Sequence, residues 1–180
     1  MSLASDPSVQ AWLDQEDRHT ADTIRRHGVY IQYVGGGRCS CCEAGVGGRS
    51  EVPPSQQEET SFAYTVGLFG IGHPELLVFG IDERTASSLL NHLARVVRGG
   101  RDLLPGELLE FDAWTHRVVV EDVPNPGEIV FAANRFYQRP SAASVPVFQL
   151  TYDDPRGRFP WDEGYANAGW IQPRPGAFRA

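Results

Sequence analysis

Residues 62–98 read FAYTVGLFGIGHPELLVFGIDERTASSLLNHLARVVR, and this stretch decides the fold class. Its first part alternates apolar and other side chains, which predicts a strand over residues 62–69. A second apolar strand is expected over residues 76–81. Because only the six residues GIGHPE connect the two segments, we predict that the strands form an antiparallel hairpin.

The remainder of this stretch predicts an amphipathic helix over residues 83–98. Asp82 is a suitable N-cap, and the glycine pair at 99 and 100 is a suitable end. The apolar residues follow helical spacing and should face the core. They include Leu89, Leu90, Leu93 and Val97.

Outward from this stretch, further helices are expected over residues 7–27 and 126–136. Asn125, Pro126 and Glu128 form a capping-box pattern at the start of the second of these helices. Strands are expected over residues 29–34, 108–111, 117–123 and 145–152, with residues 112–116 as a turn. Pro146 favours an edge position, or a late pairing, for the last strand. This order predicts a single α+β domain whose mixed or mostly antiparallel sheet is flanked by two or three helices.

The single domain divides into four segments along the chain. Residues 1–28 hold the N-terminal helix, and residues 35–60 form a loop rich in Cys, Gly and Pro, expected to be poorly ordered over 35–58 without a ligand. Residues 61–162 form the core. Residues 163–180 form a C-terminal tail, and the coil after the last strand should pack through Phe159, Trp161 and Trp170.

Composition narrows the classes of partner. The 180 residues carry a net charge of −7, which argues against nucleic acid and against anionic membranes. No segment approaches the roughly 20 apolar residues of a membrane span. Residues 1–15 lack the features of a signal peptide, and three cysteines without an export signal favour a cytoplasmic location.

Several short motifs resemble the signature of a bacterial family, the domain of unknown function 4262. They are YTVGL at 64–68, GHPEL at 72–76 and FG at 79–80, followed by FQL at 148–150, DD at 153–154 and FPWD at 159–162. The resemblance runs from about residue 28 to about residue 161. It implies domain identity, and it brings no established activity.

The turn His73-Pro74-Glu75 is the first candidate site. A histidine and a carboxylate at the end of a sheet suit acid–base or metal chemistry. Gly and Pro in the same turn equally suit a structural role in which Glu75 caps a backbone amide.

Further candidates lie on the strands. Gly67, beside Tyr64, marks close approach by a backbone or a ligand. Gln149 either bonds within the core or lines a pocket. Asp153 and Asp154 form a metal-binding pair or an ordinary turn, and Trp161 packs the tail or stacks on a ligand.

Cys39, Cys41 and Cys42 could bind a soft metal ion or sense redox state, although C-x-C-C is a weak pattern beside an incidental reduced loop. The chain has no nucleotide-binding, zinc-protease or α/β-hydrolase motif.

Two functions therefore stay open besides the cysteine site. One is a module that binds a protein or small-molecule ligand. The other is a small enzyme that uses Tyr64, His73, Glu75 and Asp154. For either, we predict a site where the 72–75 turn meets the end of the 145–152 strand.

Overall fold

The computed structural model describes residues 7–35 and 60–180. This part of the chain has three α-helices and six strands. The helices are α1 (Pro7–His27), α2 (Glu83–Arg98) and α3 (Phe131–Phe136). The strands are β1 (Tyr30–Val34), β2 (Phe62–Val66), β3 (Glu75–Phe79), β4 (Leu108–Phe111), β5 (Trp114–Asp122) and β6 (Val147–Tyr152). Three short 3₁₀ helices, η2 (Phe69–Ile71), η3 (Pro126–Glu128) and η4 (Ser141–Ala143), complete the elements.

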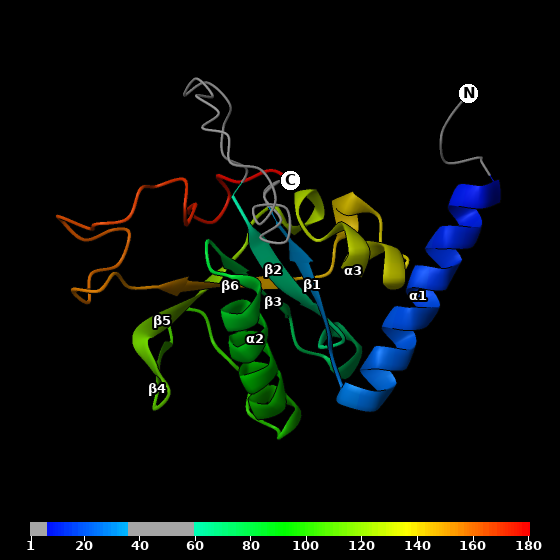
Figure 1. The fold of residues 1–180 in the computed structure, drawn as a ribbon, viewed down its shortest axis with the longest axis horizontal. Coiled ribbons are helices and arrows are strands. Elements are labelled where there is room, and N and C mark those ends of the chain that lie inside the picture. Colours follow the sequence, from blue (N-terminus) through cyan, green and yellow to red (C-terminus); the bar gives the residue numbers. More distant parts are fainter. Residues whose placement is uncertain (1–6, 36–59) are drawn as a thin grey trace, which may run out of the picture.

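The six strands form one mixed sheet in the order β1-β2-β3-β6-β5-β4 (Figure 1). β3 and β6 run parallel, and every other neighbouring pair is antiparallel. The predicted α+β class is therefore confirmed, and so is the antiparallel hairpin of β2 and β3.

Helix α2 covers one face of the sheet. Its N-cap is Asp82, whose side chain accepts a hydrogen bond from the Thr85 N–H at 3.0 Å. The predicted stripe is confirmed, because Leu89, Leu90, Leu93 and Val97 are buried in one cluster with residues of all six strands or their flanks. This cluster is the larger part of the core.

The opposite face of the sheet has two halves. Under α3, the strands β2 and β3 contribute apolar side chains to a second cluster. Alternation along β5 and β6 places Arg117, Glu121, Gln149 and Thr151 on the other half, away from the α2 cluster. The C-terminal tail covers this polar half.

The predicted helix over residues 126–136 is confirmed only in its second part, where α3 ends at Phe136 as expected. The chain forms η3, leaves helical geometry at Ile129 and Val130, and resumes as the short α3. Asn125 does not cap a backbone N–H; its amide donates to the Glu128 carboxylate and to the Phe178 carbonyl. Burial of Ile129 and Val130 in the second cluster overrides the local capping pattern.

Two strand boundaries differ from the prediction by three residues, and the others agree to within two. β2 ends at Val66 rather than at residue 69, because Gly67 has φ 140° and the chain then turns into η2. β5 begins at Trp114, so residues 114–116 are strand rather than turn. The rings of Trp114 and His116 both pack against Tyr152 of β6, which extends the strand pair.

An edge position for the last strand is wrong. β6 lies between β3 and β5, and Pro146 directly precedes it. Because Pro146 lies just before the strand, its missing N–H removes no hydrogen bond between strands. Its carbonyl accepts a hydrogen bond from the Glu75 N–H at 2.9 Å. Within residues 7–35 and 60–180, no helix has the length and hydropathy of a membrane span.

Candidate functional site

His73 is buried, with 3% of its surface exposed. The Leu103 N–H donates to its Nε2 at 3.3 Å, and its Nδ1 lies 2.7 Å from the Pro74 carbonyl. Because a carbonyl only accepts and an amide N–H only donates, the proton sits on Nδ1 and Nε2 is the acceptor. Both ring nitrogens are thus used inside the fold.

Glu75 is fully buried and accepts hydrogen bonds on both carboxyl oxygens. Thr65 donates its hydroxyl at 2.6 Å, and the N–H groups of Gly67, Leu68 and Phe69 donate at 2.8, 3.3 and 3.0 Å. Burial raises the pKa of the Glu75 carboxyl, and these four bonds oppose that rise. The contacts hold the chain in the turn after β2, which matches the structural role that the sequence left open.

Tyr64 and Gly67 also have partners within the protein. The Tyr64 hydroxyl accepts from the Ala132 N–H at 3.1 Å, and burial raises the pKa of Tyr64 to about 12. A Cβ atom at residue 67 would lie 3.0 Å from the Gly28 carbonyl oxygen and 3.2 Å from Val29 Cα. The close approach that the glycine permits is therefore made by the backbone after α1.

The parallel register separates the turn from the end of β6. Glu75 pairs with Val147, at the start of both strands. Asp154 lies seven residues beyond Val147, which is roughly 23 Å along a strand at about 3.3 Å per residue. The structure therefore does not bring His73 and Glu75 together with Asp154, and a site shared by the turn and the end of β6 is wrong.

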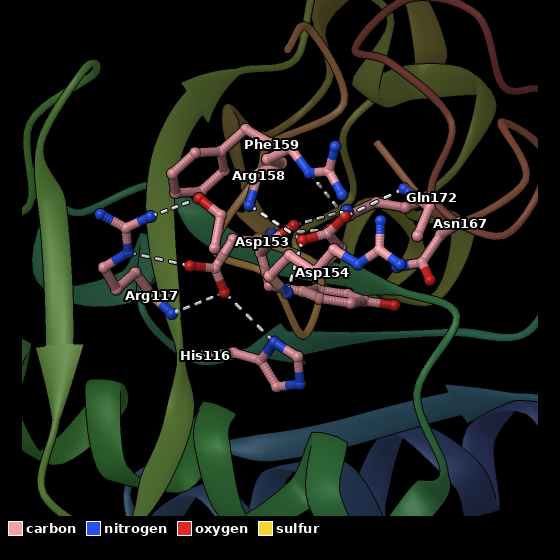
Figure 2. Close-up of polar contacts among 12 residues, drawn as sticks. His116, Arg117, Asp153, Asp154, Arg158, Phe159, Asn167 and Gln172 are labelled. Atoms are coloured by element: carbon pink, nitrogen blue, oxygen red, sulfur yellow. Dashed lines mark hydrogen bonds and ion pairs between the residues drawn. The ribbon is translucent and has the colours of Figure 1, made fainter. Parts of the chain in front are cut away.

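Asp153 joins the end of β6 to β5 (Figure 2). Its Oδ1 accepts from the Arg117 backbone N–H at 3.0 Å and lies 3.1 Å from His116 Nδ1, while its Oδ2 accepts from Arg117 Nε at 2.8 Å. Arg117 also donates a hydrogen bond from Nη2 to the Gly157 carbonyl at 2.6 Å. The carboxylate thus fixes one histidine and one arginine at the sheet end.

Asp154 organises the loop that follows. It accepts from the N–H groups of Arg156, Arg158 and Ala166 at 2.8, 2.9 and 3.0 Å. Burial alone would raise the pKa of Asp154, but these N–H groups and the Arg158 guanidinium outweigh it and lower the pKa. The Gly157 N–H bonds to the Asp154 carbonyl at 2.8 Å, as expected for the turn alternative.

Gln149 belongs to a polar network that binds the tail to the sheet. Its amide donates to the Pro173 carbonyl at 2.7 Å and to Thr151 Oγ1 at 3.3 Å. Thr151 donates to Glu121 at 2.6 Å, and Arg174 binds both oxygens of Glu121 at 2.6 and 2.8 Å. Gln149 therefore bonds within the core, and it does not line the groove described below.

Gln172 joins the tail to the backbone of β6 at Tyr152. Its Oε1 accepts from the Tyr152 N–H at 2.7 Å, and its Nε2 donates to the Tyr152 carbonyl at 2.9 Å. Nε2 also donates to the Tyr165 hydroxyl at 3.0 Å. One amide side chain thus pairs with β6 in the way that a neighbouring strand would.

Trp161 lies in a stack of four side chains. Its ring is parallel to Phe159, with centroids 4.9 Å apart, and the Arg174 guanidinium carbon lies 4.6 Å from its centroid. Arg117 lies 5.4 Å from the Phe159 centroid. Since Arg117 binds Asp153 and Arg174 binds Glu121, an ion pair anchors each end of the stack. Phe159 is buried, whereas Trp161 is 48% exposed.

An open groove runs beside Trp161. Its volume is about 450 Å³, and it is lined by Pro105, Gly106, Val119, Val120, Glu121, Asp122, Trp161, Arg174 and Pro175. The floor is β5, one wall is the loop before β4, and the other wall is the tail. Of the ligand-binding residues predicted from the sequence, Trp161 alone lines this groove.

Residues 23–166 match the family model described as a domain of unknown function, DUF4262. The chain belongs to the DUF4262 family. No curated protein and no solved structure matches it.

The DUF4262 match includes Trp161 and ends before Gln172 and Arg174. The sequence reasoning missed these two residues, because the coil has no periodicity that predicts contact with a sheet. It also missed His116 and Arg117. The alternation of Trp114, His116, Val118 and Val120 is the signal that could have placed His116 on a strand.

Metal ligands do not gather in the described part of this DUF4262 chain. Within residues 7–35 and 60–180, no three side chains of His, Cys, Asp or Glu are grouped to hold a metal ion. Cys39, Cys41 and Cys42, together with residues 36–59 of the predicted loop, lie outside the described residues.

Proposed function

We propose that this DUF4262 domain is a binding module that holds a short segment of a partner protein in the groove beside Trp161. The observation that carries the proposal is a half-exposed tryptophan on the wall of a hollow of about 450 Å³. By contrast, His73 and Glu75 use their polar atoms inside the fold.

The lining of the groove favours a protein segment as the occupant. Trp and Arg are the residue types that most often dominate the energy of protein interfaces. Trp161 offers an aromatic edge, Arg174 is paired with Glu121, and two prolines stiffen the walls. Asp122 adds one further negative charge to the lining. This mixture of apolar surface and low net charge suits a peptide better than a strongly charged small molecule.

The groove is also pre-organised. The stack on Phe159 and the ion pair of Arg174 with Glu121 hold the wall before any ligand arrives. A wall that is already ordered loses little conformational entropy on binding, so more of the contact energy appears as affinity.

Fluorine NMR of protein labelled with 5-fluorotryptophan tests the proposal. The chain has four tryptophans, at positions 12, 114, 161 and 170, so substitution to Phe assigns each signal. Peptides selected from a random display library are then titrated into the labelled protein. We expect the Trp161 signal to shift in a saturable way.

Trp170 is the matched control, because it lies in the same tail, is 53% exposed and does not line the groove. Trp161→Ala should weaken binding of a selected peptide by about thirtyfold, the effect of losing a residue worth about 2 kcal/mol. Trp170→Ala should leave the affinity unchanged. Equal affinity of the Trp161→Ala variant and the unchanged protein would refute the proposal.

A second candidate function is proton transfer by a small enzyme. The contact of Asp153 with His116 favours it, because a carboxylate that holds Nδ1–H orients the ring and leaves Nε2 as a base. This pair takes the place of the predicted set Tyr64, His73, Glu75 and Asp154. Incubation with a metabolite mixture tests it: turnover by the unchanged protein but not by His116→Gln supports an enzyme.

A cytoplasmic location, expected from the three cysteines and the absence of signal-peptide features, is part of the same proposal. So is the lack of a nucleic-acid partner, expected from the net charge of −7. A metal or redox role for Cys39, Cys41 and Cys42 stays a separate hypothesis. Metal analysis of the purified protein, compared with a variant in which all three are Ser, tests it directly.

A further inference from the structure

We infer that a second pocket, between the C-terminal ends of α1 and α2, binds the phosphate group of a small molecule. The two helix ends lie side by side at the bottom of Figure 1. Between them is a hollow of about 270 Å³, lined by His27, Val29, Asn91, Ala94, Arg95 and Arg98. It shares no lining residue with the groove beside Trp161.

The charge of this pocket is opposite to that of the whole chain. The protein carries a net charge of −7, yet the residues around the hollow include two arginines and a histidine. None of the lining residues in the described part of the chain is acidic. A concave surface that gathers cations without a carboxylate attracts an anion.

Arg98 is held in place before any ligand binds. Its Nη1 donates to the His27 carbonyl at 3.3 Å, and its guanidinium rests against Gly28. A Cβ atom at residue 28 would lie 1.6 Å from Nη1, so the absence of a side chain makes room for the arginine. Gly28 also has φ 88°, which ends α1 and turns the chain toward β1.

Both arginines keep N–H donors that have no partner among residues 7–35 and 60–180. In this part of the chain, Arg95 donates Nε to the Asn91 carbonyl at 3.2 Å, and Arg98 donates only from Nη1, to the His27 carbonyl. Each guanidinium has five N–H donors, so both groups retain donors for a ligand. Cations at the ends of helices also stabilise the helix dipoles, and that role occupies only one donor of each arginine.

The number of donors selects the class of anion. Two guanidinium groups, with the Asn91 amide and the His27 ring beside them, offer more N–H groups than the two oxygens of a carboxylate can accept. A phosphate monoester presents three oxygens, and the planar fork of arginine matches two of them at once. The volume lies just below the range of about 300–1,000 Å³ for drug-sized ligands, so the ligand is small.

NMR titration with inorganic phosphate at constant ionic strength tests this inference. We expect saturable shifts of the Arg95 and Arg98 Nε–H signals, with a dissociation constant of about 1 mM or tighter. Arg98→Gln and Arg95→Gln should each weaken binding at least about tenfold, which is about 1.4 kcal/mol. Arg84→Gln removes an exposed arginine from the first turn of the same helix and should change nothing.

Each other result overturns the inference. Equal weakening by Arg84→Gln would mean that net charge alone attracts the ion. If acetate bound as tightly as phosphate, the pocket would not prefer an anion with three oxygens over one with two. If the NMR shifts did not saturate with phosphate concentration, the pocket would not be a specific phosphate-binding site. Unfolding midpoints of all three variants show whether lost binding follows from lost structure.

Discussion

Replacement of Gln172 by Ala should destabilise the protein strongly, although the residue lies in a coil near the C-terminal end. The side chain is 2% exposed and satisfies both the N–H and the carbonyl of Tyr152. The registered pairs of β3 with β6 end at Gln149, so β3 does not offer a substitute partner there. The alanine variant leaves two buried backbone groups of a central strand unpaired.

The size of the effect follows from those two groups. Leaving a buried donor or acceptor without a partner costs about 1–3 kcal/mol, so we expect a loss of roughly 2–6 kcal/mol in the free energy of unfolding. Urea titration followed by circular dichroism measures it. Hydrogen exchange gives a local check, because the Tyr152 amide should exchange faster in the variant.

Gln10→Ala is the control for Gln172→Ala. Gln10 is exposed on α1, and among residues 7–35 and 60–180 its side chain bonds only to Asp14. Its loss should therefore change the free energy of unfolding by about 0.5 kcal/mol or less. If Gln172→Ala unfolds at the same urea concentration as the unchanged protein, the tail is not part of the cooperative fold. The pre-organised wall of the groove would then lose its basis.

Three further outcomes are expected. Leu93→Ala should cost about 2–5 kcal/mol, because Leu93 is 2% exposed under α2; an unchanged urea midpoint would contradict the assigned helix face. Burial raises the pKa of Glu75 above 4.5, so its contribution to stability is complete below pH 4.5 and is lost as the pH rises through the folded-state pKa. Glu75→Gln should abolish that decline in urea titrations from about pH 4 to about pH 8, and a decline of the same size in the variant would argue against it. Asp154 has the opposite sign: its pKa is lowered from 3.8, so its contribution is present above pH 3.8 and is lost as the pH falls through the folded-state pKa. Asp154→Asn should therefore lose less stability in acid than the unchanged protein, and acid titration followed by fluorescence checks this.

The elements that could be predicted from the sequence are those whose signal is local. The stripe of α2 and its Asp82 cap lie within one helix, and the hairpin of β2 and β3 depends on a six-residue connection. The capping pattern at Asn125 is equally local, but it failed because burial of Ile129 and Val130 decides the backbone there. Local patterns thus hold where tertiary packing agrees with them.

The candidate site could be predicted only in part, because it depends on register. The parallel pairing of β3 with β6 decides whether His73 and Asp154 lie at the same end of the sheet. The sequence of neither strand indicates whether the pairing is parallel or antiparallel. Trp161 was found from its residue type. Its neighbour Arg174 and the Glu121 carboxylate that Arg174 binds lie far apart in sequence. They meet because the tail returns across β5.

The central position of β6 also governs how the chain is completed during synthesis. Every other strand precedes β6 in the sequence, so the hairpins β2–β3 and β4–β5 leave the ribosome before the strand that joins them. Until residues 147–152 follow, both β3 and β5 expose an unpaired edge, which is the feature that drives aggregation. β5 carries Arg117 and Glu121 as charged protection, whereas β3 reads ELLVF and is apolar after its first residue. We therefore expect the nascent chain to be most prone to aggregation until β6 covers β3.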